Sequence, residues 1–186
     1  MTIDHVLSIW DFGGQDRFQF ILPTYMKGTN LLLYIIDPCS LNISIGYIKN
    51  EGYNLKRSLQ PIPELYIKTK CDLIGFDEEK DSAQIDGEIA SAFPGKEIIP
   101  VSSKTGQGFD TLISIIKNVL SMYHDVQNCT GDKTITSKVA IAGAGGVGKT
   151  TLIDRLITGR FNADTTLTVG VSYKVHRLTQ ETEKKE

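Results

Sequence analysis

The chain of 186 residues has few cysteines, no long hydrophobic run and no excess of charge of one sign. Its three cysteines, Cys39, Cys71 and Cys129, form no C-x-x-C pair, which excludes a disulfide framework and a zinc site and predicts reduced thiols. The longest apolar run, residues 31–36, is far shorter than the ~20 residues of a membrane-spanning helix. Neither end shows a secretory signal or a lipidation pattern. The sequence therefore predicts a cytoplasmic protein without a membrane anchor of its own.

The charges are nearly balanced, with 20 Lys and Arg against 22 Asp and Glu, a net charge of −2. This balance argues against a nucleic-acid-binding protein, which usually carries a basic footprint. What the chain does have is an ordinary hydrophobic share of 40%, in a length that corresponds to one domain. A chain of this size can bury a sizeable core without metal or disulfide bonds.

Predicted strands and helices alternate along the chain, which is the pattern of a parallel sheet covered by helices. A continuous apolar run is typical of a strand buried on both faces, whereas alternation is typical of an edge strand. The predicted strands are residues 6–10, 31–36, 65–67, 98–101, 139–142 and, with an alternating pattern, 169–178. Apolar residues at helical spacing predict helices over 109–123 and after Lys149, and weaker patterns predict helices near 42–58 and 82–93.

Residues 125–136 (DVQNCTGDKTIT) are polar and have little periodicity, which indicates a linker. The sequence therefore predicts one domain over residues 1–186, in which this linker joins residues 1–124 to residues 137–186. No internal repeat is present.

Residues 143–150 (GAGGVGKT) fit the phosphate-binding pattern G-x-x-x-x-G-K-S/T between a predicted strand and a predicted helix. Glycines let the backbone wrap closely around phosphate oxygens, with N–H groups directed at the anion. Lys149 is expected to place a positive charge on the outer phosphates, and Thr150 a hydroxyl on Mg²⁺. The predicted nucleotide-binding residues of this loop are Gly143, Gly145, Gly146, Val147, Gly148, Lys149, Thr150 and Thr151.

Residues 69–72 (TKCD) follow a predicted strand and resemble the guanine-recognition pattern N/T-K-x-D. The Asp72 carboxylate can accept two hydrogen bonds from the N1–H and 2-amino groups of guanine, a pair that adenine does not offer. Lys70 is expected to pack its stem along the base. Thr69 stands where asparagine is commoner and offers a shorter polar group.

Three further segments complete a resemblance to the Ras and Rab families of small GTPases. Residues 10–18 (WDFGGQDRF) resemble the family pattern W-D-x-A/G-G-Q-E/D-R-F. Residues 102–104 (SSK) resemble the S-A-K loop, and residues 168–173 (TVGVSY) resemble the Rab run T-I/V-G-V-x-F/Y. The resemblance covers nearly the whole chain.

At the phosphate end, the resemblance assigns Mg²⁺ to Thr150, Thr168 and, through water, Asp11. Thr168 stands eighteen positions after Thr150, the family's spacing for the switch threonine. The Gly14 amide is expected to sense the γ-phosphate, and Gln15 to orient the attacking water. The residues expected to act in catalysis are Gln15, Lys149 and Thr168.

At the base end, the resemblance assigns an aromatic contact and a closing loop. Phe161, eleven positions after Thr150, matches the aromatic residue that lies edge-on against guanine. The backbone N–H of Ser103 is expected to reach the O6 atom of the base. Ser102 and Lys104 are the other predicted contacts of this loop.

The motifs run in an order that differs from the family's, in which the phosphate loop comes first. Here residues 10–18 open the chain, and the phosphate loop and Thr168 close it. We interpret this as a circular permutation, cut between the strand 169–178 and the strand 6–10 and closed by the linker 125–136. The implied fold is a three-layer α/β P-loop NTPase with a six-stranded, mostly parallel sheet, one antiparallel edge strand and helices on both faces. The strand order, numbered along the chain, would be 6-1-5-2-3-4.

The resemblance implies a switch that binds GTP and GDP with Mg²⁺ and hydrolyses GTP slowly unless a partner helps. No arginine stands three positions before Thr168, where Thr165 lies, so an arginine finger within the chain is not expected. Effectors, exchange factors and GTPase-activating proteins are the expected partners, with no nucleic acid. A monomer is expected, and exchange of the terminal strand is the expected route to a dimer.

Three alternatives stay open on the sequence alone. The chain could be a nucleotide-loaded scaffold with little hydrolysis, although Gln15 and Gly145 favour hydrolysis. It could be a P-loop ATPase or kinase, since the phosphate loop does not select the base. It could also be an engineered permutant or a piece of a longer protein.

Overall fold

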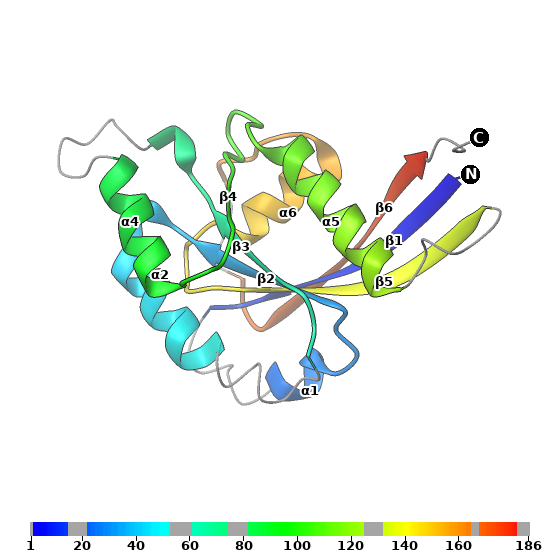
Figure 1. Ribbon diagram of the computed structural model, residues 1–186, viewed down its shortest axis with the longest axis horizontal. Helices are drawn as coiled ribbons and strands as arrows, with labels where there is room; N and C mark the ends of the chain where they lie inside the picture. Colours follow the sequence, from blue (N-terminus) through cyan, green and yellow to red (C-terminus); the bar gives the residue numbers. More distant parts are fainter. Residues whose placement is uncertain are drawn as a thin grey trace.

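A computed structural model describes residues 2–14, 22–52, 61–73, 82–124, 132–164 and 168–181. Six strands form one sheet, with helices on both of its faces (Figure 1). The strands are β1 (Thr2–Phe12), β2 (Leu31–Ile36), β3 (Glu64–Lys68), β4 (Ile98–Pro100), β5 (Lys133–Ala142) and β6 (Val171–Glu181). The α-helices are α1 (Leu22–Met26), α2 (Leu41–Tyr47), α4 (Ser82–Ala92), α5 (Phe109–Tyr123) and α6 (Lys149–Thr158). Short helical turns are η2 (Pro38–Ser40), η3 (Ile48–Gly52) and η4 (Cys71–Leu73).

The strand order in the sheet is β4-β3-β2-β5-β1-β6, which confirms the predicted order. The pairs β1–β5, β2–β5, β2–β3 and β3–β4 are parallel, and β1–β6 is antiparallel. The predicted α/β class with one antiparallel edge strand is therefore confirmed. The register pairs Trp10 with Tyr173 and Thr2 with Glu181, so the two ends of the described chain lie side by side (Figure 1).

The sheet separates two hydrophobic cores, which makes the fold three-layered. Alternate residues of β2 face opposite sides, because side chains in a strand alternate and both faces are covered. On one face, Leu31 and Leu33 pack in a core with the apolar residues of α5 and α6. On the other face, Leu32 and Tyr34 pack in a core with residues of α1, α2 and α4.

The three long strands differ in extent from the predictions. β6 covers residues 171–181 instead of 169–178, and β1 and β5 are longer than predicted. β1 covers residues 2–12 instead of 6–10, because it pairs along its whole length with β6 and along most of it with β5. β5 begins at Lys133, so the last four residues of the predicted linker 125–136 are strand. These residues, of which only Ile135 is apolar, pair in register with residues 3–6 of β1, and backbone pairing does not depend on apolar side chains. The rest of the predicted linker, apart from Asp132, lies outside the described residues.

The predicted helices are largely confirmed. The helix over 109–123 is α5, the helix after Lys149 is α6, and α4 covers most of the segment 82–93. The segment 42–58 is helical as α2 and η3 up to residue 52, and its remaining residues lie outside the described part of the chain. The five-residue helix α1 was not predicted, because it is too short to show a helical period.

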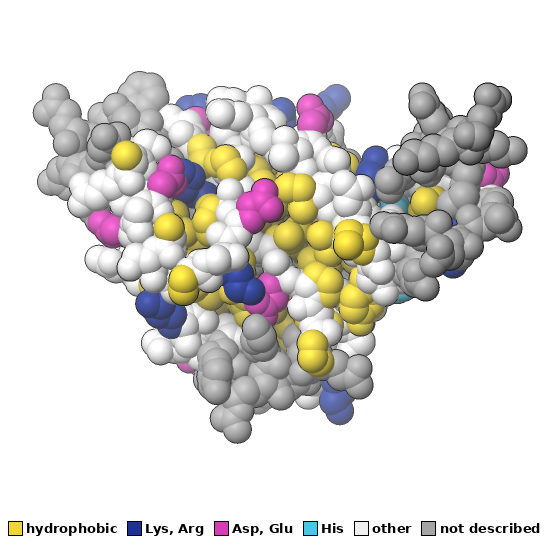
Figure 2. Space-filling model, viewed as in Figure 1, with side chains coloured by type: hydrophobic (Ala, Val, Ile, Leu, Met, Phe, Trp, Pro, Cys, Tyr) yellow, Lys and Arg dark blue, Asp and Glu magenta, His cyan; other side chains and the backbone are white. Residues whose placement is uncertain are grey.

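The surface carries mixed charges around a partly apolar centre. On the face shown in Figure 2, hydrophobic side chains gather in the middle, and basic and acidic side chains are scattered around them without a large patch of one sign. This distribution agrees with the net charge of −2. Among the residues that the structure describes, no helix is long and apolar enough to cross a membrane.

Candidate functional site

A cavity of about 640 Å³ lies at the carboxyl ends of the parallel strands. This is where open α/β sheets usually bind ligands, since the loops that leave the strands meet there. Its wall is made by the segments that follow β1, β3, β4 and β5, and by residues after α6. The lining residues are Gly14, Thr69, Lys70, Asp72, Leu73, Ser103, Lys104, Gly145, Gly146, Gly148, Lys149, Thr150, Thr151, Phe161, Asn162, Ala163 and Thr168.

The loop between β5 and α6 is bent by glycines and tied to the end of β3. Gly146 and Gly148 have φ angles of 75° and 95°, in the left-handed region that favours glycine. The Gly146 carbonyl accepts a hydrogen bond from Lys70 Nζ (3.2 Å), and the Val147 carbonyl accepts one from Thr69 Oγ1 (2.9 Å). Because a trans peptide directs its C=O and N–H to opposite sides, the N–H groups that follow these carbonyls point away from β3. Such a loop can offer N–H donors to an anion.

The ammonium group of Lys149 is buried beside this loop. Its Nζ donates hydrogen bonds to the carbonyls of Gly143 (2.8 Å) and Ala144 (2.6 Å), and the residue is only 6% exposed. Burial lowers the pKa of Lys149 to about 8, and the nearby Asp11 carboxylate partly opposes that shift. A buried cation that is held by carbonyls alone can interact strongly with a phosphate anion placed beside it.

Three oxygen-bearing side chains converge at the start of α6. Thr150 Oγ1 donates to Asp11 Oδ2 (2.5 Å), and the Thr150 and Thr168 hydroxyl oxygens are 2.7 Å apart. Thr168 Oγ1 also donates to Asp11 Oδ2 (3.2 Å). Asp11 is 2% exposed, and burial raises its pKa, although its hydrogen bonds and Lys149 partly offset this. The structure therefore gathers two hydroxyls and a carboxylate that come from β1, α6 and the segment before β6.

These donors fit a magnesium ion better than a softer metal. Mg²⁺ prefers oxygen ligands and is usually bound by one or two carboxylates together with substrate phosphates. Asp11 Oδ1 is buried and has no hydrogen-bond partner among the described residues, so one carboxylate oxygen is unused. In the described part of the chain, no group of three or more His, Cys, Asp and Glu residues could hold a metal ion without a substrate.

The Asp72 carboxylate is oriented by a buried hydroxyl. Ser102 Oγ donates to Asp72 Oδ1 (2.6 Å) and accepts from the backbone N–H of Thr105 (3.1 Å). Ser102 is fully buried and does not line the cavity, whereas Ser103 and Lys104 do. Of the three predicted residues of this loop, Ser102 therefore orients Asp72, whereas Ser103 and Lys104 line the cavity.

The Thr69 hydroxyl occupies the corner where the commoner asparagine would lie. Besides Val147, it is 3.2 Å from the carbonyl oxygen of Ile36 at the end of β2. A hydroxyl has one proton, so it donates to one of these carbonyls at a time, whereas an asparagine amide has two N–H donors. The shorter residue still links β2, β3 and the loop after β5.

Gly14 contacts the same loop from the end of β1. A Cβ atom added at Gly14 would lie 2.4 Å from backbone atoms of Ala144 and Gly145, closer than any real Cβ contact. Only glycine therefore fits at this position in the described arrangement.

Most of the predicted site residues that the structure describes line the cavity, but four do not. Asp11, Ser102, Gly143 and Val147 instead support lining residues through the contacts given above or, for Val147 and Gly143, by packing beneath the loop. Gln15 lies in the segment 15–21, outside the described residues. Leu73, Asn162 and Ala163 also line the cavity and were not predicted. Leu73 follows Asp72 and Asn162 follows Phe161, and this adjacency was the available signal, whereas Ala163 lies one residue further on.

The fold and the site together define an α/β architecture like that of P-loop GTPases. Residues 138–186, which contain the loop after β5, match the family described as "Ras of Complex, Roc, domain of DAPkinase". The chain is also 30% identical over 119 residues to the Ras-related protein Rab-1C of Dictyostelium discoideum, an alignment that covers 60% of this chain and 56% of that protein. The chain thus spans just over half the length of this curated relative. Both matches are similarities to Ras-related sequences, one over residues 138–186 and the other over 60% of the chain.

Proposed function

We propose that this protein is a GTP-binding molecular switch that hydrolyses GTP to GDP and phosphate with Mg²⁺. The observation that carries the proposal is one cavity lined both by Asp72, after β3, and by Lys149, at the start of α6. These residues belong to the base-recognition and phosphate-binding patterns, and a nucleotide is the ligand that joins a base to phosphates.

The base end of the cavity favours guanine in this proposal. The hydrogen bond from Ser102 fixes the Asp72 carboxylate, so that it can accept from the N1–H and 2-amino groups. An adenine in this place would leave the carboxylate without those donors, and an unpaired buried group costs about 1–3 kcal/mol, more when it is charged. Phe161 and Lys70 line the same cavity and supply the sides of the base pocket.

The phosphate end binds charge and the metal ion in this proposal. Lys149 would exchange its two carbonyl contacts for phosphate oxygens. Thr150, Thr168 and Asp11 would hold Mg²⁺, directly or through water. When bound, Mg²⁺ neutralises negative charge on the β- and γ-phosphates.

The proposed switch consists of the segments around Thr168 and Gly14, which line the cavity from the beginning of β6 and the end of β1. Contacts with the γ-phosphate would hold both segments, and hydrolysis would release them. Gln15 is proposed to orient the attacking water. We expect slow intrinsic turnover, which a partner that supplies an arginine could raise about 10³–10⁵-fold.

We also propose that the chain is a circular permutant of the Ras/Rab arrangement, as a single domain. The sheet order, with β5 between β1 and β2, supports this because it matches the order inferred from the rearranged motifs. The His124 Nε2 atom is 3.0 Å from Ser137 Oγ, so the end of α5 lies beside β5 and a short connection can join them. Effectors, exchange factors and activating proteins are the proposed partners.

The test of base and phosphate recognition begins with mass spectrometry of the nucleotide that co-purifies with the protein. Competition between GTP and ATP should favour GTP strongly, and Asp72→Asn should move the preference toward xanthine nucleotides. Asp110, exposed on the first turn of α5, provides a matched control, and Asp110→Asn should leave the preference unchanged. Binding of ATP as tight as GTP, or no binding of either, would contradict the proposal.

The test of hydrolysis is a single turnover of bound GTP, with Gln15→Leu as the comparison. We expect slow conversion to GDP that the substitution slows further. Tight GTP binding with no conversion in either protein would instead indicate a nucleotide-binding scaffold.

A further inference from the structure

We propose that Asp37, directly after β2, is a positioning residue that fixes Lys70 and thereby slows the release of the nucleotide. The inference rests on the proposed function, because it concerns the same cavity. Asp37 is not among the lining residues, and no sequence pattern described above includes it.

The Asp37 carboxylate is buried and held at both oxygens. The residue is 2% exposed, and its Oδ2 atom accepts from Lys70 Nζ at 2.6 Å. Its Oδ1 atom accepts from the backbone N–H of Cys39 (2.9 Å), as the N-cap of η2. The Asp37 backbone N–H donates to Ser44 Oγ in α2 (3.0 Å). These contacts hold the carboxylate in one orientation, with Oδ2 directed at Lys70 Nζ.

Lys70 is constrained at its backbone and at its tip. Its φ angle is 54°, in the left-handed region that a lysine adopts only when its surroundings require it. Its Nζ atom donates to both Asp37 and the Gly146 carbonyl. The tip of the side chain therefore links the end of β2 to the phosphate-binding loop. Lys70 also lines the cavity.

The arrangement removes the freedom that a lysine side chain normally has. A lysine side chain has considerable rotamer entropy, which an unanchored Lys70 would lose each time a ligand ordered it. Anchoring by a buried carboxylate makes this loss part of folding, so the cavity wall is preorganised before the nucleotide binds. Loss of Asp37 should therefore act on nucleotide binding through Lys70.

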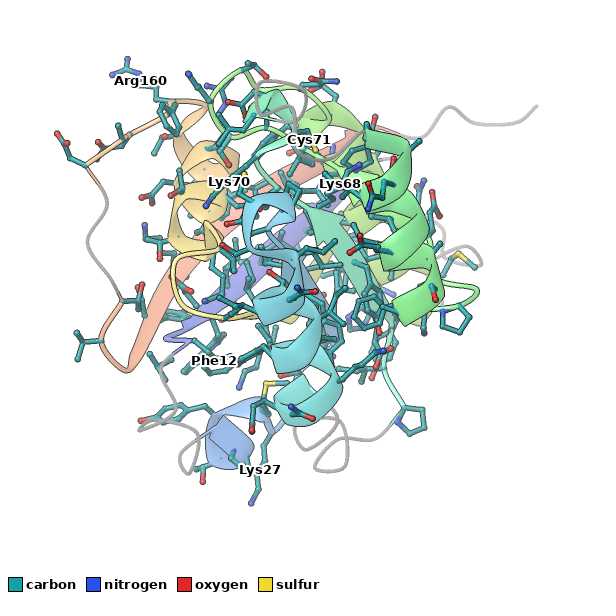
Figure 3. The ribbon with its side chains drawn as sticks, turned by 90° about the vertical axis from the view of Figure 1, so that its left-hand side faces the viewer. Phe12, Lys27, Lys68, Lys70, Cys71 and Arg160 are labelled. Atoms are coloured by element: carbon teal, nitrogen blue, oxygen red, sulfur yellow. The ribbon has the colours of Figure 1, made fainter. Side chains whose placement is uncertain are left out.

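The ion pair between Lys68 and Asp86 provides a control for the pair between Lys70 and Asp37. Lys68 at the end of β3 forms an ion pair with Asp86 of α4, and neither residue lines the cavity. Figure 3 shows Lys70 on the side of α6 and Lys68 on the side of α4. Asp86→Asn therefore breaks a Lys–Asp pair whose lysine stands two positions before Lys70, without touching the proposed site; in this pair the lysine is the buried partner.

The experiment measures the dissociation of fluorescent GDP from the whole chain by stopped-flow chase with unlabelled GDP. Asp37→Asn should release GDP about tenfold faster, equivalent to about 1.4 kcal/mol, with little change in the association rate. Asp86→Asn should release it at the wild-type rate. The double variant Asp37→Asn, Lys70→Met should behave like Lys70→Met alone, because Asp37 acts through Lys70.

If Asp37→Asn does not fold, Asp37→Ser replaces it, because serine also caps a helical turn. A wild-type release rate in the folded variant would overturn the role of Asp37 and leave the proposed function standing. Additive effects of the Asp37 and Lys70 substitutions would overturn it as well. If the wild-type chain binds neither GDP nor GTP, both proposals fail together.

Discussion

The buried Asp11 carboxylate is suited to bind a metal ion, but its burial destabilises the fold when that ion is absent. Its carboxylate is almost fully buried, and burial raises its pKa despite the donors Thr150 and Thr168. A carboxyl group whose pKa is higher in the folded state reduces stability at every pH at which it is ionised in the unfolded chain. At neutral pH, Asp11 is therefore destabilising despite the nearby Lys149, until a metal ion lies beside it.

We expect Asp11→Asn to raise the melting temperature of the protein free of nucleotide and Mg²⁺ by a few degrees, since the ionised group is removed. The same substitution should abolish the stabilisation that Mg²⁺ gives in the presence of GDP. Differential scanning fluorimetry with GDP, with and without Mg²⁺, measures both effects. A lower melting temperature without ligands would show that the ionised carboxylate stabilises the fold instead.

Lys149 predicts a pH dependence of nucleotide binding. Its pKa of about 8 in the free protein lies below the ordinary lysine value of 10.5. Above about pH 8 the free amine must take up a proton to bind phosphate, so affinity for GDP should fall about tenfold per pH unit until the ordinary value is approached. The stability of the empty protein should change in the opposite sense, rising between about pH 8 and 10.5, because the folded state releases its proton first.

Calorimetry of GDP binding at pH 9, in two buffers that differ in ionisation enthalpy, measures this proton uptake directly. Nearly one proton should be taken up per GDP by the wild-type chain. Lys149→Arg is the control, because arginine stays protonated. Equal uptake in both proteins would assign the proton to another group.

At the residue scale, the sequence predicted most of the cavity wall and also Ser102 behind it, but missed Asp37 and the hydrogen bonds that orient Asp72 and Lys70. Asp72 and Lys149 belong to patterns with fixed spacing, which is why they could be identified. The hydrogen bond from Ser102 to Asp72 joins the loops that follow β4 and β3, and the hydrogen bond from Lys70 to Asp37 joins the segments that follow β3 and β2. Such pairs depend on which strands are neighbours, and no local pattern records that.

At the scale of elements, helix α5 illustrates why some segments were predictable. Its buried residues Leu112, Ile116 and Leu120 recur every four positions and face one side of the sheet. The beginning of β5 has no such signal, because its pairing with β1 depends on backbone bonds. Helical periodicity was therefore sufficient to predict α5, whereas residues 133–136 at the start of β5 were interpreted as part of a linker.

We expect Leu112→Ala to destabilise the fold by about 2–5 kcal/mol, since Leu112 is fully buried and the smaller residue leaves a cavity. Ser114→Ala on the exposed face of the same helix should change the stability by no more than about 0.5 kcal/mol. Urea unfolding at equilibrium compares the two. Similar costs for both would mean that α5 does not pack as described.

At the scale of the whole molecule, the order of the strands in space differs from their order in the chain. β5 lies between β1 and β2, although it follows them by many residues. β1 pairs on one side with β5 and on the other with β6, so two elements from the end of the chain enclose its first strand. The centre of the sheet therefore forms only after most of the chain is available.

The proposed permutation predicts that the chain can be reconnected without loss of the fold. Because Thr2 pairs with Glu181, a turn of a few residues should join residue 181 to residue 2, with new ends opened within residues 125–131. The rearranged chain should bind GDP with an affinity within a few-fold of the original. Circular dichroism and GDP titration measure this, and an unfolded product would count against the permutation.

The pairing of Thr2 with Glu181 also decides which side of the molecule stays free when the protein is attached to something. Both residues lie at the amino end of β1, and the cavity lies beyond its carboxyl end. A tag, a fluorophore or a solid support coupled to Thr2 or Glu181 would thus sit a full strand length from the mouth of the cavity. On a sensor chip to which the protein is attached in this way, the cavity of every attached molecule should open toward the solution.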